Sequence, residues 1–213
     1  MTTQVMTTQA PFPAASRLLH WLMAPMILTM LFIGVGMAAS VSARYELLVS
    51  IHQPLGIAIL VLFMIRIVNR FVNPPPALPD TVPSVQRFAA KTSHIVLYAL
   101  MFIMPLVGWG MLSAARYPIV LFGPVHLPFI LPHDPMLYAV LRKAHTVLAY
   151  LLFLTILAHV GAILFHTLVV RDGMLKRMAP WSALPQKPGA AAPPGATEPP
   201  DTEPLVAKRT PEF

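Results

Sequence analysis

The chain lacks cysteine entirely, since none occurs among its 213 residues. This absence excludes disulfides, thiolate zinc sites, cysteine-ligated iron–sulfur clusters, covalent c-type haem and cysteine nucleophiles. Charge is also scarce, because Asp, Glu, Lys and Arg make up only 11% of the chain, against about 25% in an average soluble protein. Hydrophobic residues reach 56%, and the mean hydropathy is +0.68. A soluble fold of this size cannot bury so much apolar surface, so the composition predicts an integral membrane protein with lipid as its surroundings.

The basic excess does not indicate a nucleic-acid partner. The formal net charge is +7, but the basic residues are spread along the ends of apolar stretches rather than gathered on one face. We therefore expect no binding of nucleic acid.

Four apolar stretches are long enough to cross a bilayer, which takes about 20 residues of helix. They cover residues 18–39, 47–65, 88–115 and 137–170. No segment alternates in the way that the strands of a membrane barrel do. The first 15 residues contain no basic residue, and the apolar run after them is too long for a signal peptide, so we expect a retained span. The sequence thus predicts an all-α integral membrane four-helix bundle.

Lysine and arginine are distributed unevenly between the two sides of this predicted bundle. Eight lie at the span ends that share a side with the termini, and four lie on the other side, which predicts that both termini face the cytoplasm. The eight are Arg17, Arg66, Arg70, Arg87, Lys91, Arg171, Lys176 and Arg177, and the four are Arg44, Arg116, Arg142 and Lys143.

The chain divides into three predicted parts. Residues 1–15 form a short N-terminal tail, and residues 16–178 form the transmembrane domain. Residues 179–213 are rich in proline and alanine, a composition that predicts a disordered C-terminal tail.

Histidine is the residue type that suggests chemistry. Two of the eight histidines, His126 and His133, fall in the loop at 116–136 and are expected to be solvated. An ionisable side chain inside a membrane is costly, so the other six are functional candidates. These six are His20, His52, His94, His145, His159 and His166.

The spacing of the fourth-span histidines indicates two separate sites. His145 and His159 are 14 residues apart, close to four full helical turns, so both face almost the same way. They lie about 21 Å apart along the helix axis, too far for one metal ion to bridge. Matching the remaining spans by depth pairs His52 with His145 on the outer side.

The same depth argument pairs His20 with His159 on the inner side. Each pair supplies two imidazole nitrogens from different helices, as a six-coordinate haem iron requires. Two protein ligands leave no open position on the iron, so the sequence predicts one-electron transfer rather than oxygen binding. Nearby glycines either leave room for the macrocycle or serve helix packing. They are Gly34, Gly36, Gly56, Gly108, Gly110 and Gly161.

An ordered set of motifs resembles the bacterial cytochrome b561 family over about residues 16–180. The set consists of Arg17-Leu-Leu-His20-Trp21, Ile51-His52 with Gly56, Arg66 and Arg70, the prolines at 74–76, His94-x-x-x-Tyr98, Pro105-x-x-Gly108, the histidines at 145, 159 and 166, Arg171-Asp172 and Arg177-Met178-x-Pro180. One departure from the pattern is Pro54, which removes a backbone donor two residues after His52. The second span is therefore expected either to begin near Gln53 or to bend there.

The resemblance implies a diheme b-type cytochrome of the bacterial inner membrane that exchanges electrons with the ubiquinone pool. Carried over by position, the haem-iron ligands are His20, His52, His145 and His159. Similar proteins include superoxide oxidases, which imply an oxidoreductase that passes electrons from periplasmic superoxide to ubiquinone. The related hydrogenase cytochrome b subunits imply an alternative, in which the chain is an electron conduit for a separate dehydrogenase or hydrogenase. The oligomeric state stays open, with a homo-oligomer as one option.

Two further groups of residues are candidates under the superoxide hypothesis. A basic rim at the outer side raises the encounter rate of a small anion, and the quinone site needs hydrogen-bonding and proton-relaying groups on the inner side. The candidates for anion steering are Arg44, Arg116, Arg142 and Lys143, and the candidates for the quinone site are His166, His94 and Lys91.

Overall fold

The computed structural model describes residues 12–41, 43–74, 83–171 and 173–179. The predicted disordered tail lies outside these described residues, apart from Ala179, and so does most of the N-terminal tail.

Four long helices dominate the described chain. They are α1 (Ala14–Ala38), α2 (Ala43–Val72), α3 (Ser84–Ala115) and α4 (Pro135–Phe165), the last continued by the π-helix η1 (His166–Val170). A short helix, α5 (Met174–Met178), follows. All four long helices are long and apolar enough to cross a membrane. The prediction of a helical membrane protein with four spans is confirmed.

The four long helices begin two to four residues before the predicted apolar stretches, because partly polar first turns belong to the helices. Prolines Pro13 and Pro83 precede α1 and α3, where the fixed φ of proline suits a helix start. Before α4, the Asp134 side chain accepts hydrogen bonds from the main-chain N–H groups of Met136 and Leu137. Such a cap contributes about 1 kcal/mol to helix stability.

Of the two alternatives at Pro54, a helix that begins near Gln53 is wrong, and the helix also begins four residues before the apolar stretch at 47–65. Helix α2 begins at Ala43, and Pro54 lies inside it, so His52 is the tenth residue of the helix rather than its first. An unwound segment in lipid would leave several backbone groups without partners, whereas an internal proline removes only one hydrogen bond. The helix therefore continues through Pro54.

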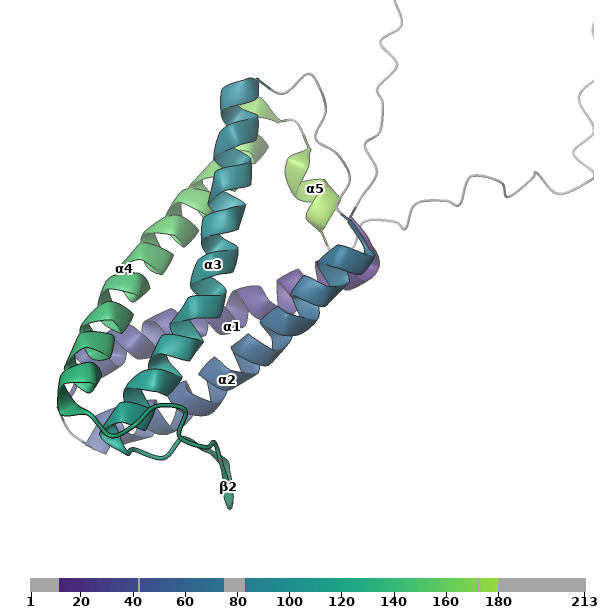
Figure 1. Cartoon of the computed structure of the whole chain (residues 1–213). Coiled ribbons are helices and arrows are strands. Elements are labelled where there is room, and N and C mark those ends of the chain that lie inside the picture. The colour runs from purple at the N-terminus through teal and green to yellow at the C-terminus, as the bar shows by residue number, and fades with distance from the viewer. Residues whose placement is uncertain (1–11, 42, 75–82, 172, 180–213) are drawn as a thin grey trace, which may run out of the picture.

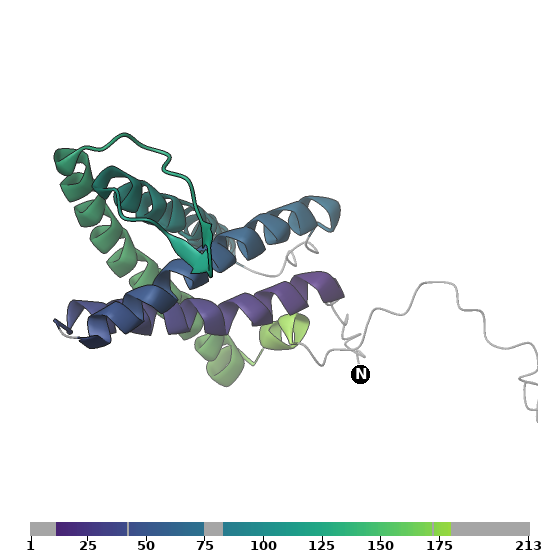
Figure 2. The ribbon, with the colours of Figure 1, turned by 90° about the horizontal axis from the view of Figure 1, so that it is seen from below.

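The loop after α3 contains two short strands, which the sequence analysis did not predict. Strand β1 (Val120–Phe122) pairs antiparallel with β2 (Val125–His126), and Gly123 adopts a positive φ of 53° in the turn. With three and two residues, the strands are too short to show a periodic pattern. Strand β1 lies against α2 (Figure 2).

The long helices form two pairs, α1 with α2 and α3 with α4, which are inclined to each other (Figure 1). The pairs meet around a small apolar core of Met23, Ile59 and Phe63, against which Tyr98 and Met101 pack. Many large apolar side chains elsewhere are exposed, as expected where lipid surrounds the protein. We call the end that carries β1 and β2 the hairpin end, and the opposite end, where Phe12 donates to the Arg177 carbonyl at 3.1 Å, the terminus end.

Candidate haem-binding site

His52 and His145 face each other near the hairpin end. His52 is the tenth residue of α2, and His145 is the eleventh residue of α4, counted from that end. Their ring centroids are 6.2 Å apart, with an angle of 68° between the ring planes. The Nδ1 atom of each ring is buried and has no hydrogen-bond partner in the described part of the chain. The backbone of Met104 lies close to the His145 ring, so that ring is not without a polar neighbour. A buried ring nitrogen that forms no hydrogen bond is costly unless a ligand meets it.

The spacing of this pair would allow the two rings to hold a haem iron between them. Two metal–imidazole bonds of about 2 Å each, with the radius of a ring added at each end, separate the ligand centroids by about 6 Å. No group of three or more His, Cys, Asp or Glu side chains suited to a metal ion occurs among the described residues. A Cβ atom at Gly108 would lie 3.2 Å from Cε1 of His145, so Gly108 keeps space for this ring.

A second group of histidines lies toward the terminus end. It combines His20, the seventh residue of α1, with His94 of α3 and His159 of α4. The rings of His94 and His159 have centroids 5.6 Å apart at an angle of 76°. His20 interacts electrostatically with both of these rings. The structure therefore places the predicted partners His20 and His159 at the same end and adds His94, whose ring contacts that of His159.

Arg66 is a site residue that the sequence analysis did not single out for a role. Its Nε donates to the Tyr98 hydroxyl at 3.2 Å, and its Nη1 donates to the Ser16 carbonyl at 3.5 Å. Its Nη2 lies 3.5 Å from Nδ1 of His20. A spacing signal exists, because Arg66 follows His52 by the same 14 residues that separate the two histidines of α4.

Polar side chains extend this cluster at the terminus end. Asn69 donates to the Ser16 hydroxyl at 2.8 Å, and Asn73 donates to the Asn69 side chain at 3.0 Å. The Arg70 guanidinium lies over the Tyr98 ring at 5.3 Å from its centroid. These contacts join α1, α2 and α3 around a positively charged polar patch.

The quinone-site candidates occupy different positions along the terminus end. His94 donates through Nδ1 to the Ala90 carbonyl at 2.7 Å and packs on His159. Lys91 is exposed one turn before it on α3. His166 begins the π-helix η1, and its carbonyl accepts from the Arg171 N–H at 2.7 Å. The structure places His94 beside a candidate ligand, with His166 seven residues beyond His159.

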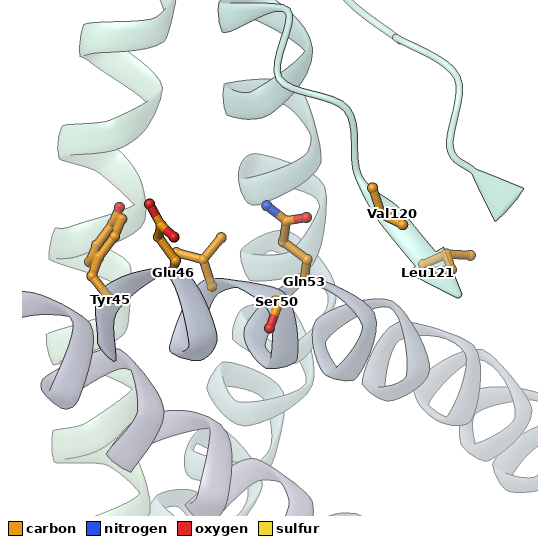
Figure 3. Close-up of a pocket in the computed structure, with 7 residues that line it drawn as sticks. Tyr45, Glu46, Ser50, Gln53, Val120 and Leu121 are labelled. Atoms are coloured by element: carbon orange, nitrogen blue, oxygen red, sulfur yellow. The ribbon is translucent and has the colours of Figure 1, made fainter. Parts of the chain in front are cut away.

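The four steering candidates are all exposed at the hairpin end. Arg116 ends α3 in the left-handed conformation, and its guanidinium lies 4.9 Å from the centroid of the Phe129 ring. A cleft of about 360 Å³ opens nearby between α2 and β1 (Figure 3). Its only charged lining residue in the described chain is Glu46. The cleft itself therefore does not attract anions, and any steering comes from the cations around it.

Comparisons with known proteins show the family of the chain. A family model described as prokaryotic cytochrome b561 matches residues 11–181. The chain is 29% identical to "Cytochrome b561 homolog 1" of Escherichia coli (strain K12) over an alignment of 170 residues that covers 76% of this chain and 93% of the relative. It is 27% identical to "Cytochrome b561 homolog 2" of the same organism over 173 residues, 80% of this chain and 92% of the relative.

A third relative carries a functional name. The chain is 34% identical to "Probable superoxide oxidase CybB" of Yersinia pestis over 135 residues, 61% of this chain and 73% of the relative. With four apolar helices and the family match over residues 11–181, the chain belongs to the prokaryotic cytochrome b561 family, multi-pass bacterial membrane proteins that bind b-type haem and act as oxidoreductases in electron transfer.

Proposed function

We propose that the protein is a diheme cytochrome of the bacterial inner membrane that passes single electrons from periplasmic superoxide to ubiquinone. His52 and His145 hold one haem, and His20 and His159 hold the other. The observation that carries the proposal is the His52–His145 pair, whose rings face each other at 6.2 Å with buried, unpaired Nδ1 atoms. The name of the Yersinia pestis relative supports superoxide as the donor.

The ligand set limits the chemistry. When bound, b-type haem supplies reversible one-electron transfer. With two histidines holding each haem iron, the protein would leave no ligand position for oxygen, and the haem would serve electron transfer. His145 and His159 stand on one helix at different depths, about 21 Å apart along its axis. Helix α4 thus carries one ligand of each proposed site and sets the route across the membrane.

The proposed orientation places the hairpin end in the periplasm. The excess of lysine and arginine at the terminus end supports cytoplasmic termini. Superoxide then meets the end where the four basic candidates oppose only Glu46 and Asp134, a net charge of +2 with neutral histidines. A basic rim of this kind raises the encounter rate of a small anion.

Charge substitutions at the hairpin end test this steering. In stopped-flow measurements, the double variant Arg142→Gln/Lys143→Gln is expected to lower the rate of haem reduction by superoxide up to about tenfold at low ionic strength. The matched variant Glu46→Gln removes the opposite charge and is expected to raise the rate. Both effects shrink as salt increases, because exposed charges are screened. Rates that do not respond to these charges at low salt would exclude steering.

The proposed quinone site lies at the terminus end. Reduction of a quinone to a quinol takes up two protons with two electrons, so the site needs groups that relay protons. His94 suits this role because its ring packs on His159. We include His166 and Lys91 in the same site as a further imidazole and an exposed ammonium group on that side.

A haem count tests the proposal before any kinetics. The purified full-length protein is expected to contain two b-type haems per chain, measured from its pyridine haemochrome spectrum against the protein concentration. One haem per chain would contradict the diheme arrangement. A protein without haem would show that neither histidine pair binds one.

A further inference from the structure

We propose that Arg66 raises the reduction potential of the terminus-end haem above that of the hairpin-end haem and so directs electrons toward the terminus end. This inference rests on the proposed function, because it requires one haem at each histidine pair.

The position of Arg66 is fixed by contacts to two neighbouring helices. Its guanidinium, on α2, donates to the Ser16 carbonyl of α1 and to the Tyr98 hydroxyl of α3. The third contact is to Nδ1 of His20, a proposed ligand, at 3.5 Å. All three partners are neutral groups or a neutral ring, and the side chain is half-buried. A full positive charge is thus held next to the terminus-end site.

No carboxylate in the described chain neutralises this charge. The described residues include only two acidic side chains, Glu46 and Asp134, and both lie at the hairpin end. Arg70 adds a second cation over the Tyr98 ring and interacts electrostatically with His94. Among the described residues, the terminus-end site therefore has two neighbouring cations, Arg66 and Arg70, and no carboxylate.

The hairpin-end site has a different environment. The ionisable neighbour of His52 is His145, its own proposed partner in ligation. The basic residues of this end, such as Arg142 and Lys143, are exposed, so water and salt screen their charges. A half-buried arginine is screened far less.

This asymmetry acts directly on electron affinity. Each site would use two histidine ligands, so a difference in potential between the sites would come from their surroundings, such as charge, hydrogen bonding and burial. A fixed positive charge favours the state with one more electron. Arginine stays protonated at any physiological pH, so the effect does not depend on pH. An electron received at the hairpin end is then held more tightly at the terminus end.

A redox titration of the full-length, haem-loaded protein tests this inference. Two one-electron components are expected in the visible spectrum, with the higher potential at the terminus end. Arg66→Gln is expected to lower the reduction potential of that component by about 59 mV, which corresponds to a tenfold change in a one-electron equilibrium. The reduction potential of the hairpin-end component should not change. Arg66→Lys keeps the charge and should retain most of the potential, and the shift should be the same at pH 6 and pH 9.

Two further variants complete the test. The loss of one component in His145→Leu assigns the other to the terminus end. Tyr98→Phe keeps the cation but removes one of its anchors, and a smaller fall confined to the terminus-end component would support the inference even where Arg66→Gln fails to assemble. Equal shifts in both components, or an equal fall in Arg66→Lys and Arg66→Gln, would overturn it. Those outcomes leave a protein with two haems and do not affect the proposed function, whereas a wild-type protein with fewer than two haems contradicts both.

Discussion

Replacing His145 with leucine is expected to halve the haem content and to abolish reduction of the protein by superoxide. Leucine fills a similar volume but offers no nitrogen, so His52 would be left as the single protein ligand of the hairpin-end haem. Its ring faces His145 at 6.2 Å, in a pair whose Nδ1 atoms have no other partner among the described residues. The haem per chain should fall from two to one, and the initial rate of reduction by superoxide should fall to background.

The matched control for this substitution is His126→Leu. His126 lies at the same end, in β2, but is exposed and bonds through Nδ1 to the Pro124 carbonyl at 2.8 Å. It belongs to neither proposed ligand pair, so this variant should keep both haems and its reaction with superoxide. Two haems in His145→Leu would show that His145 is not a ligand.

Replacing His159 with leucine is expected to separate the two halves of the reaction. The terminus-end haem loses a ligand, while the pair at His52 and His145 stays complete. Superoxide should still reduce the remaining haem, because it approaches from the opposite end. The rate at which a ubiquinone analogue oxidises the reduced haem should fall at least a hundredfold. The remaining haem site is about 21 Å further from the proposed quinone site, measured along α4, than the site that is lost. Stopped-flow spectra with and without the quinone measure both steps.

His166→Ala is the comparison for this second variant. It leaves all four proposed ligands in place, so the spectrum should be unchanged while reduction of the quinone slows. Fast discharge by quinone in His159→Leu would instead place the quinone near the hairpin end. Unchanged turnover in His166→Ala would remove that residue from the quinone site.

The sequence predicted the four spans because long apolar runs are a strong signal. It placed the start of α2 four residues late, since Ala43 to Glu46 form a partly polar first turn. It also missed the β1–β2 hairpin, whose strands are too short for a visible pattern. The grouping of histidines by depth followed from helix geometry alone, because a rise of about 1.5 Å per residue turns sequence position into height.

Contacts between helices are what the sequence did not reveal. The histidine pattern placed His94 on the quinone side, but it did not reveal that the His94 ring packs on that of His159. Spacing tells which residues share a face of one helix, not how that helix is rotated against its neighbour. Arg66 had a usable signal in its 14-residue distance from His52. Its partners Tyr98 and Ser16 lie on other helices and required the folded structure.

Reduction of the oxidised protein by superoxide is the most direct test of the central claim. Superoxide is added to the purified protein while the visible spectrum is followed, and the experiment is repeated with a ubiquinone analogue present. The account predicts that the bands of reduced b-type haem appear rapidly and are discharged by the quinone. Bands that appear with dithionite but not with superoxide would contradict it and would identify the chain as an electron conduit for another protein.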